Sequence, residues 1–135
     1  MKFSLPLFFL LTISFFCCKN STSQAPAQDQ TVKTKFIDLD VQQFDKMRVS
    51  KDVIVLDVRT PGEVAEGIVD DAVVINVNGN DFDQKIKELD KSKTYLVYCK
   101  AGGRSVKACN KMSEQGFSTL YNLKGGYTAW TKTNQ

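Results

Sequence analysis

The apolar residues of this chain fall into short continuous runs that are typical of buried β-strands. Three runs rich in β-branched or aromatic residues occupy positions 52–58, 72–77 and 94–99. Such runs suit strands that are covered on both faces, as they are in parallel sheets. Two shorter runs, at 35–40 and 117–123, predict one further strand towards each end of the pattern.

Between these runs, apolar residues recur every three or four positions, which is the spacing of one helical face. The spacing predicts helices over residues 41–48, 81–90 and 105–116, the first of them starting at Asp38 or Asp40. The segments "RTPGEVAEG" and "KGGYTAW" are turn-rich, and each predicts a single turn of helix. Strands that alternate with helices predict an α/β architecture with a mainly parallel sheet, in which sites form beyond the carboxyl ends of the strands.

The first residues have a different character from the rest of the chain. After Met1 and Lys2, an apolar stretch runs over residues 3–16, which is short for a membrane-spanning helix of about 20 residues. It fits a secretory signal. Because a cysteine and a polar tail follow, residues 1–17 resemble a bacterial lipoprotein signal, which is cut before a cysteine that is then lipidated. We prefer Cys18 to Cys17, since a small residue precedes Cys18. A plain secretory signal or an uncleaved anchor is the alternative.

This interpretation divides the chain into a signal, a flexible linker over residues 18–33, and one domain over residues 34–135. We expect an exported monomer on the periplasmic face of a bacterial membrane, attached through its lipid. The formal charge of +3, without any basic run, argues against nucleic-acid binding. Export permits a disulfide between Cys99 and Cys109, which the sequence does not exclude.

The residues around the end of the third long run have the chemistry of an anion-binding loop. A thiol at a helix start is favoured as thiolate, because unpaired amides and the positive end of the helix dipole face it. Gly102 and Gly103 let successive N–H groups turn towards one point, and Arg104 offers a planar fork of donors for an oxyanion. Ser105 would cap the helix or donate to the sulfur. The candidate site therefore comprises a catalytic Cys99 and the substrate-binding residues Lys100, Ala101, Gly102, Gly103, Arg104 and Ser105.

Other chemistries are excluded or less favoured by residue type. The chain has no histidine, which rules out a Cys–His pair and a histidine base. Two cysteines ten residues apart do not make a zinc site, so we expect neither a metal nor a cofactor. A free cysteine is most often a small apolar packing residue, and we assign that role to Cys109, which shares a helical face with Val106 and Met112. Transfer of sulfur needs little proton transfer and suits a thiolate that is activated by electrostatics alone.

Four further residues are assigned structural roles. Asp57 and Arg59 end a predicted strand near the site, where an ion pair between loops is favoured over contact with substrate. Tyr127 and Trp130 are interpreted as packing residues that close the domain.

With these motifs in order, residues 34–130 resemble the single-domain rhodaneses, the thiosulfate sulfurtransferase-like domains. "LDVRTPGEV" is similar to the first signature of that family, "YCKAGGRS" to its active-site loop and "LKGGYTAW" to its C-terminal signature. The resemblance implies a rhodanese-like, doubly wound α/β fold with a mainly parallel five-stranded sheet. It also implies that Cys99 carries a persulfide stabilised by the amides of residues 100–104. Sulfane sulfur would pass from thiosulfate or a similar anionic donor to a thiol or cyanide acceptor.

Loop length and one departure bear on this resemblance. Arg104 follows Cys99 in a C-x4-R pattern, whereas phosphatases and arsenate reductases of the related fold are similar to C-x5-R, with room for a tetrahedral oxyanion. The shorter loop favours sulfur.

The family often has a Gly-His-Ile segment followed by Gly-Ala, and here Ile68 replaces the histidine and Asp71 the glycine.

The alternative function is a non-catalytic rhodanese-like module that binds a protein or a persulfidated partner.

Overall fold

A five-stranded sheet forms the centre of residues 35–134, which are the residues that the computed structural model describes. The strand order is β1-β5-β4-β2-β3, and every neighbouring pair is parallel. The predicted fold class is therefore confirmed. The predicted signal, the linker and the cysteines at 17 and 18 lie outside the described residues. The strands are β1 (Ile37–Leu39), β2 (Val53–Asp57), β3 (Val73–Val74), β4 (Thr94–Tyr98) and β5 (Thr119–Leu123).

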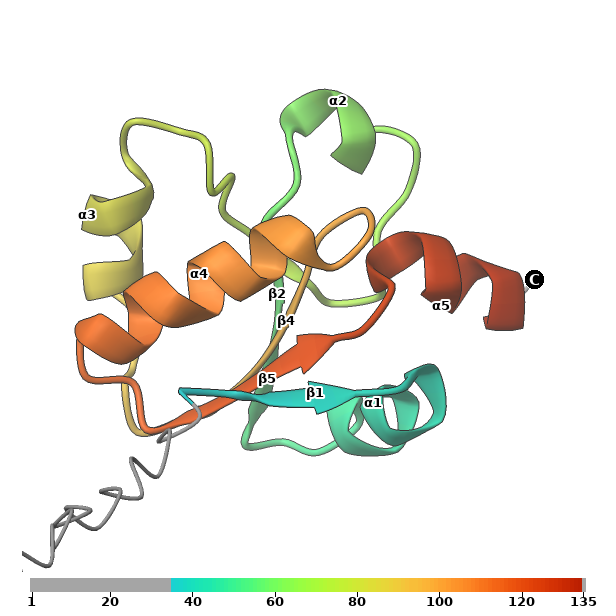
Figure 1. Cartoon of the computed structure of the whole chain (residues 1–135), viewed down its shortest axis with the longest axis horizontal. Coiled ribbons are helices and arrows are strands. Elements are labelled where there is room, and N and C mark those ends of the chain that lie inside the picture. The colour runs from blue at the N-terminus through green and yellow to red at the C-terminus, as the bar shows by residue number, and fades with distance from the viewer. Residues whose placement is uncertain (1–34, 135) are drawn as a thin grey trace, which may run out of the picture. The chain divides into compact units, whose positions relative to one another are not determined.

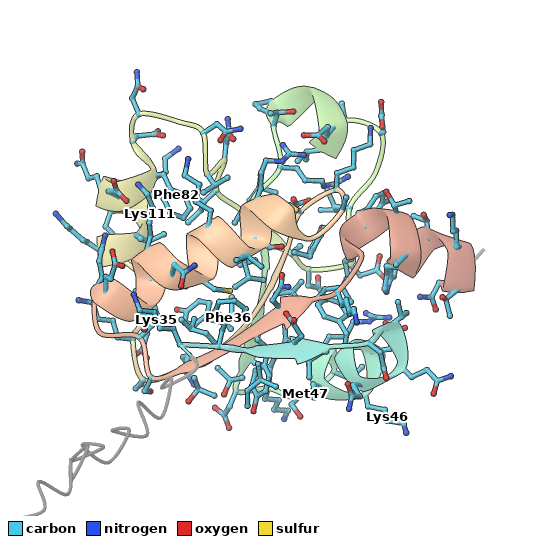
Figure 2. All side chains as sticks on the ribbon, in the orientation of Figure 1. Lys35, Phe36, Lys46, Met47, Phe82 and Lys111 are labelled. Carbon is cyan, nitrogen blue, oxygen red and sulfur yellow. The ribbon has the colours of Figure 1, made fainter. Side chains whose placement is uncertain are left out.

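Helices cover both faces of this sheet, as Figure 1 shows. One face is packed by α3 and α4, and the other by α1 and α5. In Figure 2, Phe82 of α3 lies beside Lys111 of α4, whereas Met47 of α1 lies across the sheet from them. None of the helices within residues 35–134 has the length and apolar character that crossing a membrane requires. The helices are α1 (Val41–Arg48), α2 (Pro61–Val64), α3 (Phe82–Lys87), α4 (Gly103–Glu114) and α5 (Gly126–Asn134).

Strand β4 supplies side chains alternately to the two cores. Tyr95 and Val97 belong to the core beneath α3 and α4, and Leu96 and Tyr98 belong to the core beneath α1 and α5. Since side chains alternate along a strand, the next residue, Cys99, points to the α4 face. The periodicity of one strand thus directs the thiol towards the start of a helix.

The start of α1 is fixed by a capping box, which resolves the choice between Asp38 and Asp40. The amide of Gln43 donates to Asp40 Oδ1 at 2.8 Å, and the amide of Asp40 donates to the Gln43 side chain at 3.1 Å. This reciprocal pair satisfies two of the amides that a helix start leaves without a partner.

The prediction of a buried strand over residues 72–77 is wrong in extent and burial. Only Val73 and Val74 pair with β2 as β3, and each is 41% exposed because β3 is an edge strand. Ile75 and Val77 follow the strand and are the buried residues of this run. The apolar run therefore reflects burial of the segment after the strand.

The final helix is longer than predicted. The sequence predicts one turn, whereas α5 has nine residues. Trp130 stacks on Tyr127 with 5.8 Å between ring centroids, and its indole Nε1 donates to Asp45 of α1 at 2.9 Å. The bond to Asp45 ties α5 to α1, and such tertiary contacts stabilise a helix whose sequence has only weak periodicity.

Candidate functional site

The loop between β4 and α4 places Cys99 at the carboxyl end of the sheet and at the amino end of a twelve-residue helix. In Figure 1 this loop lies between α2 and α5. The first turn of a helix leaves its backbone N–H groups without an intrahelical partner, and ligands of open parallel sheets bind beyond the carboxyl ends of the strands. The sequence prediction of the site depended on this geometry, and the structure has it.

Hydrogen-bond donors converge on the sulfur of Cys99. The amide of Gly102 donates to Sγ at 3.1 Å, from a residue with φ of 101°. This left-handed conformation favours glycine and turns the amide back towards the strand. The Ser105 hydroxyl lies 3.5 Å from Sγ and 2.8 Å from the Gly102 carbonyl oxygen. The hydroxyl has a single proton and can donate it to only one of these two acceptors. Ser105 therefore donates to the Gly102 carbonyl oxygen when Cys99 is protonated, and it can rotate to donate to Sγ when Cys99 is a thiolate.

These donors decide the ionisation of Cys99. Burial raises the pKa of the thiol, whereas hydrogen bonds from Ser105 and from the amides of Ala101 and Gly102 lower it. The net shift is downward, although the residue is only 1% exposed. A buried thiol without such donors behaves in the opposite way: burial raises the pKa of Cys109 to about 12. Local hydrogen bonds therefore outweigh desolvation at Cys99.

The first residues of α5 hold the loop in this conformation. The amide of Tyr127 donates to the Cys99 carbonyl oxygen at 2.7 Å, and the amide of Thr128 donates to the Lys100 carbonyl oxygen at 3.0 Å. With these carbonyl groups turned to α5, the amides that follow can point to the sulfur. A Cβ at Gly126 would lie against the Cys99 carbonyl oxygen and 2.7 Å from the Lys100 carbonyl carbon. The motif "KGGYTAW" thus permits a close backbone approach that the sequence analysis did not anticipate.

The guanidinium of Arg104 is held by a residue that the sequence analysis also did not identify. Its Nη1 and Nη2 donate to the two carboxylate oxygens of Glu63 at 2.7 and 2.6 Å. This fork lowers the pKa of Glu63 to about 2, and Glu63, followed by the Cys99 sulfur, raises the pKa of Arg104. Both terminal nitrogens of Arg104 are thus engaged by a carboxylate, and the predicted contact of this side chain with an oxyanion stays a prediction. The capping pattern of Thr60 and Glu63 was the available sequence signal, because a carboxylate there faces a helix start.

A buried ion pair supports the segment that carries Glu63. Arg59 Nη2 lies 2.6 Å from Asp57 Oδ2, and both side chains are almost fully buried. The same guanidinium donates to the carbonyl oxygens of Glu63 and Gly67 at 3.1 and 2.7 Å, and the Tyr98 hydroxyl donates to Asp57 at 2.7 Å. The predicted structural role of this pair is confirmed. The two residues do not join separate loops, because Asp57 ends β2 and Arg59 lies two residues later in the turn that follows.

The remaining candidates divide between the loop and the core. Lys100 and Ala101 are exposed, and Gly103 opens α4. Cys109 is fully buried against the sheet, as predicted, and both cysteines of the described residues are free. Within residues 35–134 no group of three or more His, Cys, Asp or Glu side chains is arranged to hold a metal ion.

The lowered pKa of Cys99 gives a testable prediction for alkylation. An acid is charged above its pKa, so the rate of reaction with iodoacetamide should rise with pH and reach its midpoint below the value of about 8.5 of a free thiol. Mass spectrometry of the labelled peptides separates Cys99 from Cys109, which should stay unlabelled in the folded protein. A midpoint at or above the free-thiol value would contradict the proposed convergence of donors.

Comparison with known proteins places this geometry in context. A family model described as a rhodanese-like domain matches residues 40–133. The thiosulfate sulfurtransferase GlpE of Shewanella oneidensis is 32% identical over 101 residues, which cover 75% of this chain and 98% of that protein. A protein of Allochromatium vinosum named sulfurtransferase is 34% identical over 83 residues, which cover 62% of this chain and 76% of the relative.

Solved structures agree with the fold. The crystal structure of a rhodanese-related protein from Thermoplasma volcanium superposes with a TM-score of 0.64 at 26% identity, covering 73% of this chain and 93% of that one. A rhodanese-like domain protein from Staphylococcus aureus gives a TM-score of 0.63 at 26% identity, covering 70% and 91%.

Proposed function

Because the chain belongs to the family of rhodanese-like domains, we propose that it is a sulfurtransferase that carries sulfane sulfur on Cys99. The donor is thiosulfate or a similar small anion, and the acceptor is a thiol or cyanide. The observation that supports this proposal most strongly is the set of donors around one sulfur, with the Gly102 amide 3.1 Å from Sγ. Relatives named sulfurtransferase support the same class of reaction.

In the first half of the proposed reaction, the Cys99 thiolate attacks the outer sulfur of thiosulfate. The S–S bond of thiosulfate breaks, its electron pair leaves with sulfite, and Cys99 becomes a persulfide anion. No proton is transferred in this step, which suits a chain that has no histidine. The charge moves outward by one sulfur atom, towards the first turn of α4, where the amides of Gly103 and Arg104 have no intrahelical acceptor.

In the second half, the acceptor attacks the outer sulfur of the persulfide. With cyanide, the S–S bond breaks, thiocyanate leaves and the Cys99 thiolate returns. With a thiol, the thiol proton remains on the new persulfide of the acceptor. The donors that lower the pKa of Cys99 also make its thiolate a better leaving group, so one set of hydrogen bonds assists both halves.

The direct test supplies thiosulfate and cyanide to the full chain and measures thiocyanate. We expect steady turnover well above the rate without protein. Thiocyanate formation no faster than the protein-free rate would contradict the proposal and favour the binding module. Hydrolysis of an aryl phosphate that depends on Cys99 would favour a phosphatase instead.

Arg104→Ala should weaken the use of anionic donors while the fold is retained. The side chain is 28% exposed, so its removal leaves no buried cavity. The variant loses a cation beside the sulfur and leaves Glu63 without its partner, and we expect kcat/KM for thiosulfate to fall by about 10- to 100-fold. Lys107→Ala, an exposed lysine on the same helix, is the matched control. Equal kinetics for both variants would show that Arg104 does not act on the substrate.

We also infer export and lipidation at Cys18, with residues 1–17 removed, residues 18–33 as a linker and the domain at 34–135. This assignment is supported by the sequence pattern alone. The mass of the mature protein from a bacterial membrane fraction tests it: a diacylated or triacylated Cys18 is expected. An unacylated N-terminus would contradict the lipid anchor and leave the assignment of Cys99 unaffected.

A further inference from the structure

The side chain of Arg104 belongs to the turn that surrounds the Cys99 sulfur, but its charge is matched by a carboxylate. Arg104 stands in the first turn of α4 between Gly102, whose amide donates to Sγ at 3.1 Å, and Ser105, whose hydroxyl lies 3.5 Å from Sγ. Both of its terminal nitrogens donate to Glu63 of α2, at 2.7 and 2.6 Å. Helix α2 lies next to the amino end of α4 (Figure 1), and this ion pair joins the two helices.

Glu63 is also held in place independently of Arg104. The amide and the hydroxyl of Thr60 donate to its Oε2 at 3.1 and 2.8 Å, and Arg59 donates to its carbonyl oxygen at 3.1 Å. Hydrogen bonds from Arg104 and Thr60 lower the pKa of this carboxyl group to about 2, so Glu63 is charged at neutral pH. A donor that approaches the sulfur therefore meets a fixed ion pair rather than a free guanidinium.

The balance of charge in this pair matters because the proposed donor and the nucleophile repel each other. Thiosulfate carries two negative charges, and the Cys99 thiolate carries one. Glu63 and, after it, the Cys99 sulfur raise the pKa of Arg104, which places the guanidinium within reach of charges at that sulfur. Charges separated by less than about 8–10 Å interact through physiological salt, so a donor at Sγ can feel the pair without touching it. The pair offers no net charge to balance the second charge of thiosulfate.

We propose that Glu63 determines donor specificity by cancelling the charge of Arg104, which disfavours doubly charged sulfane-sulfur donors relative to singly charged ones. The inference rests on the sulfurtransferase function proposed above. Methanethiosulfonate, CH3SO2S−, is a singly charged analogue of thiosulfate in which a methyl group replaces one oxygen. The Cys99 thiolate attacks its outer sulfur, the S–S bond breaks and its electron pair leaves with methanesulfinate. Cys99 becomes a persulfide anion, so atoms and charge balance as they do with thiosulfate.

The test measures kcat/KM of the full chain for both donors, with cyanide as the acceptor, and follows the ratio of thiosulfate to methanethiosulfonate. Losses that affect both donors equally cancel in this ratio. Glu63→Gln keeps an acceptor for the cap at Thr60 and frees the charge of Arg104, so the ratio should rise about five- to tenfold. Arg104→Gln leaves Glu63 unbalanced, and the ratio should fall by a similar factor.

Two further variants complete the test. The double variant Glu63→Gln/Arg104→Gln restores the native net charge of the pair, and its ratio should return to within about twofold of the native value. Glu88→Gln, which removes the charge of an exposed glutamate after α3, is the matched control and should leave the ratio unchanged. Should Glu63→Gln fail to fold, the step from Arg104→Gln to the double variant removes the same carboxylate charge.

The direction of these changes separates the proposal from a merely structural role. If Glu63 only holds Arg104 in place, Glu63→Gln lowers kcat/KM for both donors and the ratio does not rise. That result, or a ratio that does not rise between Arg104→Gln and the double variant, overturns the proposal, while thiocyanate formation by the native chain leaves the sulfurtransferase function standing. If the native chain converts neither donor, the function itself fails and the role of Glu63 fails with it.

Discussion

Replacing Cys99 by serine should abolish sulfur transfer while leaving the folded domain intact. A serine hydroxyl is not ionised at neutral pH, and the chain has no histidine that could take its proton. The oxygen can accept the hydrogen bonds that Gly102 and Ser105 direct to this position. We therefore expect thiocyanate formation to fall by more than about 10³-fold, with a thermal unfolding midpoint close to that of the native protein.

Cys109→Ala is the matched control for this variant. Cys109 is also free and buried, but it lies in the core beneath α4 and its pKa is raised to about 12 by burial. Its replacement should lower stability by about 1 kcal/mol and leave the activity of the remaining folded protein in place. An active Cys99→Ser protein, or an inactive Cys109→Ala protein that is folded, would reverse the assignment of the two cysteines.

Replacing Gly126 by alanine should have the largest effect among the structural positions of the site. The residue has φ of 59°, and a Cβ there would meet the backbone of Cys99, Lys100 and Ala101. Because backbone atoms cannot turn aside as a side chain can, either α5 or the loop must move. We expect a loss of about 3–5 kcal/mol in the free energy of unfolding, measured in urea. In the folded fraction, the amides that face the sulfur should be displaced and the pKa of Cys99 should rise.

Gly62→Ala tests whether this loss is specific. A Cβ at Gly62 would meet nothing within 4 Å, and the residue lies in α2, where alanine is favoured over glycine. Stability close to that of the native protein is expected for this control. A Gly126→Ala protein with native stability and native activity would show that α5 does not position the loop.

The elements at the centre of the sheet were predictable because their signals are local. The apolar runs that form β2 and β4 have both neighbours and both faces covered, so burial and strand coincide in them. At the edge strand β3, burial and strand do not coincide. The apolar run at 72–77 reflects the burial of Ile75 and Val77, which follow the strand, and therefore does not predict the length of β3. Helix α5 depends on Trp130 and its bond to Asp45, 85 residues earlier, which no local pattern records.

The same distinction applies to the site. The position of Cys99 between a strand and a glycine turn is a local feature, and it led to the loop residues 99–105. Two arrangements were not predictable: the pair of Arg104 with Glu63, which are 41 residues apart, and the approach of Gly126 to the loop. Both depend on how α2 and α5 pack around the carboxyl end of the sheet.

The central claim is that a buried thiolate, held by amides of its own loop, accepts a sulfur atom. Peptide mapping by mass spectrometry after treatment of the full chain with thiosulfate tests it most directly. We predict that the peptide containing Cys99 gains the mass of one sulfur atom, that cyanide removes it, and that the peptide containing Cys109 is unchanged. A Cys99 peptide of unchanged mass under conditions of turnover, or sulfur found on Cys109 instead, would contradict the account.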